Sequence, residues 1–133
     1  GSYNTEAYIQ SLNEIVFCIM IEKYAAVENL TAILDAAVKL GVDMVQWGPA
    51  DYSLSVGNPA LQRSDDILPI ESKVITESLA AGLHPRIEIG SPDQAQRFID
   101  QGVRHFCVGW DRFILQQKLL EIGESMRSVT EGI

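Results

Sequence analysis

Positive charge is scarce in this sequence. Lys and Arg together number 10, against 18 Asp and Glu, and the formal net charge at pH 7 is −8. Nucleic acids and anionic membranes are bound through clusters of basic residues that replace phosphate counterions. The sequence has no such cluster, so we expect neither nucleic acid nor a membrane as a partner.

Long hydrophobic runs are also missing. The longest apolar stretch covers residues 15–21, whereas a membrane-spanning helix needs about 20 apolar residues. No charged-then-apolar signal peptide opens the chain, and we therefore expect a cytoplasmic protein. Only two cysteines occur, Cys18 and Cys107, each inside an apolar segment. This favours buried free thiols in a reducing compartment over a disulfide framework or a catalytic pair.

The glycine-rich motifs of nucleotide-binding proteins are absent as well. No dinucleotide fingerprint follows a predicted strand, and no phosphate-binding loop with a Lys is present, which argues against the usual nucleotide-binding folds. The chain has 133 residues and a hydrophobic content of 47%, enough for one domain with its own core. We place that domain at residues 3–133, because Gly1 and Ser2 look like the remnant of a cleaved tag.

Short apolar runs alternate with longer amphipathic segments along the chain. The runs predict strands at 15–21, 44–47, 86–89 and 105–108. The amphipathic segments predict helices at 27–40, 67–81, 92–101 and 112–126, with a long loop at 48–66. Strands that are apolar throughout are typical of a parallel sheet with helices on its faces. Two α/β architectures fit this pattern, a doubly wound open sheet and a (β/α) barrel, and composition does not choose between them.

Two carboxylates stand directly after predicted strands. Glu22 follows the apolar run 15–21, and Asp51 follows 44–47 after a short turn. The carboxyl ends of parallel strands meet at one edge of the sheet, where ligands bind in α/β proteins. Two convergent carboxylates there suit a hard divalent cation such as Mg²⁺ or Mn²⁺. The alternative is that both are solvated acids on loop tips.

The residues around these acids carry a family resemblance. The segments 19–23, 27–30 and 41–53, the last containing Gly-Pro-Ala-Asp, resemble the metal-dependent class II pyruvate aldolases of the 4-hydroxy-2-oxoheptanedioate aldolase family; citrate-lyase β-type proteins are more distant relatives. Segment 102–111 is similar to the final strand of that family. The resemblance implies an α/β fold of four βα units, which is half of an eight-unit TIM barrel.

The resemblance also implies a function and a site. Glu22 and Asp51 would be the ligands of a divalent metal, Mg²⁺ or Mn²⁺ and possibly Co²⁺. Gly48, Pro49 and Ala50 would join Asp51 in binding a 2-keto acid. The implied reaction is retro-aldol cleavage of 4-hydroxy-2-oxo acids to pyruvate and an aldehyde. The alternative is a non-catalytic half-barrel module that binds metal and keto acid without turnover.

Several positions depart from the family pattern. Met20 stands where the family usually has Gln, and Tyr52 replaces a Leu. The family takes its catalytic base, a His, and an Arg from its first four strands, and no residue of this chain matches either, so the catalytic residues are unknown. His84 and His105 stand at the starts of predicted strands, the end opposite the acids. Asp111 follows a strand and is a weaker candidate for the pocket wall.

A half barrel leaves two strand edges with unpaired backbone groups, which invites association. We therefore expect a homo-oligomer, formed either by closing two halves into one barrel or by exchanging elements between copies. The resemblance adds the segment 112–126 as a contact surface.

Overall fold

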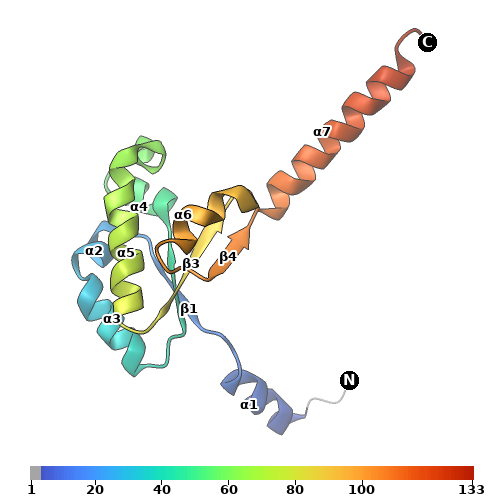
Figure 1. Cartoon of the computed structure of the whole chain (residues 1–133). Helices are drawn as coiled ribbons and strands as arrows, with labels where there is room; N and C mark the ends of the chain where they lie inside the picture. Colours follow the sequence, from blue (N-terminus) through green and yellow to red (C-terminus); the bar gives the residue numbers. More distant parts are fainter. Residues whose placement is uncertain (1–3) are drawn as a thin grey trace.

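The computed structural model describes residues 4–133, and a single four-stranded parallel sheet lies at its centre (Figure 1). The expected start of the domain at residue 3 and the tag remnant lie outside the described residues. The strands are β1 (Cys18–Ile21), β2 (Met44–Trp47), β3 (His84–Ile89) and β4 (His105–Val108). Their order in the sheet is β1-β2-β3-β4, so each strand pairs with the next along the chain. A doubly wound sheet reverses its strand order, whereas a barrel does not. The half-barrel prediction is confirmed.

Helices connect the strands and extend from both ends of the sheet. They are α1 (Thr5–Asn13), α2 (Tyr24–Glu28), α3 (Leu30–Lys39), α4 (Pro49–Ser55), α5 (Leu68–Ala80), α6 (Gln96–Ile99) and α7 (Asp111–Thr130). Short 3₁₀ turns are η1 (Pro59–Arg63), η2 (Asp65–Ile67) and η3 (Pro92–Ala95). Among residues 4–133, no helix combines the length and the hydropathy that a membrane span requires.

The two faces of the sheet differ in character. On one face, Ile21, Val45 and Ile87 are buried, α5 contacts β2 and β3, and α3 packs against α5. On the other face the strand register aligns Met20, Gln46 and Arg86. This second face corresponds to the inside of a barrel, and Met20 is about half exposed on it.

The first strand and the first helix differ from the prediction. Residues 15–17 are exposed and precede β1, because β2 begins only at Met44, opposite Cys18. The single helix expected at 27–40 is two helices that break at Asn29. The Asn29 side chain donates a hydrogen bond from Nδ2 to the Ala25 carbonyl at 2.8 Å, and such bonds compete with helix continuation.

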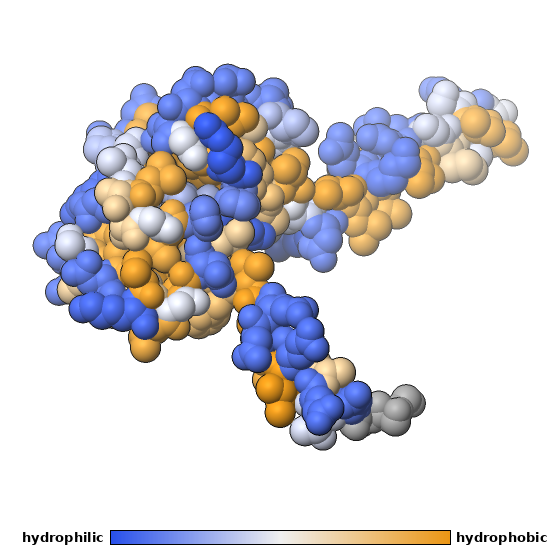
Figure 2. All heavy atoms as spheres, turned by 60° about the horizontal axis from the view of Figure 1, so that its bottom comes forward, coloured by the Kyte–Doolittle hydropathy of each residue, from blue (hydrophilic) through white to orange (hydrophobic). Residues whose placement is uncertain are grey.

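Other boundaries were also wrong. The loop expected at 48–66 contains α4, η1 and η2. The last helix is longer than expected, and α1 was not predicted at all. Neither α1 nor α7 contains a buried residue, and both project from the body of the domain (Figure 1). Figure 2 shows apolar side chains along both projecting segments.

Candidate active site

A cavity of about 610 Å³ opens at the carboxyl end of the sheet. Its walls come from the ends of β1, β2 and β3, from α4, α5 and η1, and from the start of α7. The lining residues are Met20, Glu22, Gln46, Trp47, Gly48, Pro49, Ala50, Asp51, Gln62, Glu71, Ile87, Glu88, Ile89, Gly90, Gly109, Trp110, Phe113, Ile114 and Gln117. All five residues proposed from the sequence for metal or keto-acid binding, Glu22, Gly48, Pro49, Ala50 and Asp51, line this cavity.

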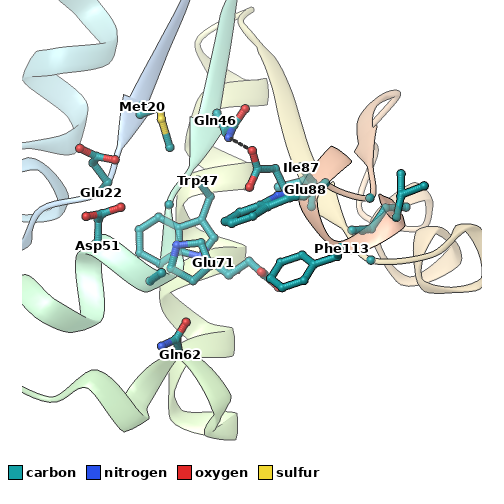
Figure 3. Close-up of a pocket in the computed structure, with 18 of the residues that line it drawn as sticks. Met20, Glu22, Gln46, Trp47, Asp51, Gln62, Glu71, Ile87, Glu88 and Phe113 are labelled. Atoms are coloured by element: carbon teal, nitrogen blue, oxygen red, sulfur yellow. Dashed lines mark hydrogen bonds between the residues drawn. The ribbon is translucent and has the colours of Figure 1, made fainter. Parts of the chain in front are cut away.

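The two acids lie together on one side of the cavity (Figure 3). Lys23 Nζ is 3.7 Å from Glu22 Oε1 and 3.8 Å from Asp51 Oδ1, so one ammonium group contacts both carboxylates. Glu22 directly follows β1, and Asp51 lies in the first turn of α4. The register of β1 and β2 places Ile21 opposite Trp47, which brings the two connections side by side.

The turn between β2 and α4 fits tightly against β1. The Gly48 N–H donates to the Ile21 carbonyl at 3.0 Å, and a Cβ at Gly48 would lie 2.7 Å from Glu22 Cβ and 3.2 Å from Met20 Cε. Pro49 opens α4, where its fixed φ and missing N–H are well tolerated. The first backbone bond of this helix runs from Tyr52 N–H to the Gly48 carbonyl. The N–H groups of Ala50 and Asp51 precede it and have no partner within the helix.

Gly48→Ala is expected to weaken Mn²⁺ binding, because the added methyl group must displace the Glu22 side chain. Calorimetric titration with Mn²⁺ measures the effect, which we expect to be roughly tenfold, or about 1.4 kcal/mol. Gly123→Ala is the matched control, since a Cβ there meets nothing within 4 Å. Unchanged Mn²⁺ affinity in a folded Gly48→Ala protein would contradict the placement of Glu22 as a ligand.

A polar network on the inner face of the sheet was not predicted. Gln46 is only 4% exposed, and its Nε2 donates to Glu88 Oε1 at 2.7 Å, as Figure 3 shows. Its Oε1 accepts a hydrogen bond from Arg86. One buried amide thus links two charged side chains of β3. The sequence signal was a Gln inside an apolar strand, followed by Arg and Glu at alternate positions of another.

Glu71 is a second functional group that sequence reasoning missed. It is buried in α5, lines the cavity, and pairs with Arg97 of α6 at 2.9 Å. Burial raises the pKa of Glu71 above its ordinary value, and the Arg97 guanidinium offsets only part of that increase. An acid two residues after a helix-opening Pro looks solvated in sequence, so nothing there signalled its burial.

The raised pKa of Glu71 gives a pH dependence that can be measured. The native state holds this proton more tightly than the unfolded chain, so stability falls as pH rises from about 4.3 through the raised pKa. Gln at this position does not titrate. The stability of the wild type relative to Glu71→Gln is therefore expected to decrease from acidic pH towards neutrality, as measured by urea unfolding. A relative stability that increases with pH would contradict this sign.

Trp47, Trp110 and Phe113 form much of the remaining wall, and Tyr52 packs on Trp47 behind it. The Trp47 and Tyr52 ring centroids are 5.1 Å apart, and those of Trp110 and Phe113 are 5.6 Å apart and stacked. Trp47 Nε1 is buried and has no hydrogen-bond partner among the described residues, so a donor is available at the cavity wall. Burial raises the pKa of Tyr52, the residue that replaces the family's Leu.

The other titratable residues singled out from the sequence lie elsewhere. His84 and His105 begin β3 and β4, at the opposite end of the sheet, with ring centroids 5.3 Å apart. Asp111 does not line the cavity: it opens α7 and accepts a hydrogen bond from Arg112 N–H at 2.7 Å, while its neighbour Trp110 forms the wall.

The cysteine prediction was partly wrong. Both thiols are free, but they are half buried rather than buried. Cys18 shares the inner face of the sheet with Met20, and the register pairs Cys107 with Glu88 of the same face. That face corresponds to the inside of a barrel, and the four strands of the described chain do not close around it, so neither thiol is fully enclosed. Burial raises the pKa of Cys18.

The donor set fits a hard cation with few protein ligands. Within residues 4–133 no group of three or more His, Cys, Asp and Glu side chains converges. Glu22 and Asp51 supply carboxylate oxygen, and Mg²⁺ is commonly held by one or two carboxylates while water and substrate complete its shell. The ammonium of Lys23 beside both acids supports a preference for positive charge at this position.

The sheet order, the position of the cavity and the acids at its rim define half of a (β/α) barrel with a ligand site at its carboxyl end. Residues 2–117 match the sequence profile of a family described as HpcH/HpaI aldolase/citrate lyase. The chain belongs to this family of carbon–carbon lyases.

Individual relatives agree with this assignment. The chain is 32% identical over 115 residues to a 2-keto-3-deoxy-L-rhamnonate aldolase of Klebsiella pneumoniae, covering 86% of this chain and 42% of that protein. It is 31% identical over 109 residues to a 4-hydroxy-2-oxo-heptane-1,7-dioate aldolase of Shigella sonnei, covering 81% and 40%. The chain thus spans about two fifths of the length of these relatives.

Solved structures share the fold. An HpcH/HpaI aldolase from Desulfitobacterium hafniense superposes with a TM-score of 0.75 at 23% identity, covering 96% of this chain and 49% of that one. The citrate synthase SbnG gives a TM-score of 0.74 at 26% identity, covering 98% and 53%. In each case the chain corresponds to about half of a barrel.

Proposed function

We propose that this chain is the metal- and keto-acid-binding half of a lyase that cleaves 4-hydroxy-2-oxo acids to pyruvate and an aldehyde. The observation that carries the proposal is the pair of carboxylates, Glu22 and Asp51, sharing one ammonium group at the rim of the cavity. Membership of the aldolase/citrate lyase family and the names of the relatives support the reaction type.

Glu22 and Asp51 would hold Mg²⁺ or Mn²⁺ through their carboxylate oxygens. When bound, such an ion would supply a Lewis acid that stabilises the negative charge developing as the carbon–carbon bond breaks. A bound ion would displace the Lys23 ammonium from the two acids. Breaking these ion pairs would cost little free energy, because the Lys23 side chain is exposed.

The turn at 48–51 would bind the carboxylate of the keto acid. The N–H groups of Ala50 and Asp51 lie at the start of α4, where backbone donors favour an anion. Gly48 allows this turn to approach β1, and Pro49 restrains its backbone. Trp47, packed on Tyr52 beneath the turn, limits the access of water from that side.

A second candidate, binding without turnover, is favoured by one observation. Of the described residues that line the cavity, none is a His, Lys or Arg. A retro-aldol reaction needs a base to remove the hydroxyl proton. The other acids of the wall are engaged, Glu71 with Arg97 and Glu88 with Gln46. The chain alone is therefore expected to bind metal and keto acid, and turnover would require groups from another half barrel.

Self-association would cover the open inner face of the sheet, but a second copy carries the same residues and would supply neither the His nor the Arg that the resemblance places in the other half. The outer edges of β1 and β4 pair with no other strand in the described chain, and Met20 and Val108 are about half exposed there. Open edges of this kind promote association between chains. A stable monomer in equilibrium sedimentation at micromolar concentration would contradict a homo-oligomer.

The decisive experiment combines binding with turnover. Calorimetric titration measures Mn²⁺ binding to the chain and then pyruvate binding to the Mn²⁺-loaded chain, and a coupled assay follows pyruvate release from a 4-hydroxy-2-oxo acid. Binding together with turnover supports the lyase, whereas binding alone supports the module. If neither ion nor pyruvate binds, both candidates are wrong.

A further inference from the structure

All the charged side chains of the cavity wall are acidic. Four carboxylates line it, those of Glu22, Asp51, Glu71 and Glu88, and no basic side chain of the described residues does. Two of these acids, Glu22 and Asp51, would be neutralised by a bound cation under the proposed function. Glu88 has no cation among its ion pairs or hydrogen bonds in residues 4–133, and its Oε1 accepts only from the Gln46 amide.

Cations beside the cavity contact residues of its wall rather than the space inside it. Arg97 reaches Glu71 at 2.9 Å, from α6. Arg86 donates to the Gln46 amide on the inner face of the sheet. Lys23 lies at the paired acids, on the other side of Trp47 from Phe113. The wall around Phe113 therefore presents no guanidinium or ammonium group to a second carboxylate of a bound ligand.

The wall away from the paired acids is aromatic and aliphatic. Figure 3 places Glu22 and Asp51 on one side of Trp47, and Phe113 and Ile87 on the other. Phe113 stacks with Trp110, and Ile114 of the same helical turn also lines the cavity. A keto acid held at the paired acids and longer than pyruvate would extend past Trp47 towards this wall.

We propose that the site selects 2-keto acids whose distal end is uncharged and apolar, and discriminates against those with a second carboxylate. The inference rests on the proposed function and narrows its substrate class. Phe113 favours an apolar end by contact, and Glu88 disfavours a carboxylate by like-charge repulsion next to a wall of low polarity. Specific sites commonly combine an attractive and a repulsive element, and the cavity has one of each.

Binding to the Mn²⁺-loaded chain tests the selectivity without requiring turnover. The ligands are pyruvate, 2-oxo-4-phenylbutanoate and 2-oxoadipate, which share the keto-acid end and differ in the rest. The chain has two tryptophans, Trp47 and Trp110, and both line the cavity, so intrinsic fluorescence reports ligand entry alongside calorimetry. We expect the phenyl ligand to bind at least tenfold more tightly than 2-oxoadipate.

Two variants separate the attractive from the repulsive element. Phe113→Ala is expected to reduce affinity for 2-oxo-4-phenylbutanoate by about tenfold and to leave pyruvate affinity within about twofold. Glu88→Gln keeps an acceptor for Gln46 and is expected to raise 2-oxoadipate affinity several-fold. Glu124→Gln, on an exposed part of α7, removes the same charge away from the cavity and serves as its control.

The outcomes distinguish this inference from the proposal on which it depends. If pyruvate binds but 2-oxoadipate binds as tightly as the phenyl ligand, the selectivity is wrong and the proposed function stands. Equal effects of Glu88→Gln and Glu124→Gln on 2-oxoadipate would also overturn it. If the loaded chain binds none of the three keto acids, the proposed function fails, and the selectivity fails with it.

Discussion

Asp51→Asn is expected to lower the affinity of the chain for Mn²⁺ by roughly 100-fold, or about 2.7 kcal/mol. The substitution keeps the shape of the side chain and removes one of the two negative charges that meet at the rim. A hard cation depends on the charge of its oxygen ligands more than on their size. Glu22→Gln should have a similar effect, because each acid would supply one ligand. Titration calorimetry, with free Mn²⁺ followed by electron paramagnetic resonance, measures both.

Asp35→Asn is the matched control for this charge change. Asp35 is exposed on α3, outside the cavity wall, and its loss alters the net charge of the chain by the same amount. Mn²⁺ affinity should stay within about twofold of the wild type, since exposed charges beyond a Debye length of about 8 Å are largely screened at physiological salt. Equal losses in Asp35→Asn and Asp51→Asn would mean that Mn²⁺ binds diffusely to an acidic surface.

Leu34→Ala is expected to have the largest effect on stability, a loss of about 2–5 kcal/mol. Leu34 lies in the middle of α3, is 2% exposed, and belongs to the buried hydrophobic core. Truncation removes buried methyl groups and leaves a cavity that the packed helix and sheet cannot fill. Small domains unfold with only about 5–15 kcal/mol, so this loss is a large share of the total. Urea unfolding followed by far-ultraviolet circular dichroism gives the difference.

Leu40→Ala makes the same chemical change six positions along the chain, where the side chain is 80% exposed. Surface substitutions away from special features usually change stability by less than about 0.5 kcal/mol. A comparable loss in both variants would show that α3 does not pack on the sheet as described. The comparison also bears on the candidate site, because Glu22 directly follows β1 and the turn at 48–51 directly follows β2.

The strands were the most predictable part of the fold. The bounds of β2 and β4 agree with the sequence prediction, because each is a short apolar run bounded by Gly or charged residues. Apolar character alone overextended the first strand, since residues 15–17 are apolar but have no neighbouring strand to pair with. Helical periodicity does not reveal the break at Asn29, which depends on a side chain bonding to the backbone of the preceding turn.

The candidate site likewise contains residues that the sequence predicts and residues that it does not. Glu22 and Asp51 could be proposed because parallel strands bring their carboxyl ends to one edge, so position in the chain implies position in space. Glu71 and Gln46 could not be proposed from the sequence, because their place in the site depends on packing between elements far apart in the chain. Glu71 is buried by the docking of α5 against the sheet and is paired with an Arg from a different helix. Gln46 is polar within an apolar strand because that face of the sheet looks into a barrel interior.

The aromatic side of the cavity is attached to a helix with little support. Trp110 and Phe113 stand at the first turn of α7, yet none of the residues of that helix is buried. Most of the stability of a helix in a protein comes from tertiary packing, and α7 has no buried residue to supply it. A molecule that binds the later turns of α7 would therefore also order Trp110 and Phe113 at its start. By thermodynamic reciprocity, a ligand that contacts these two rings would raise the affinity of α7 for that molecule. Binding of a ligand in the cavity and binding of a partner to α7 would then be thermodynamically coupled, each raising the affinity for the other.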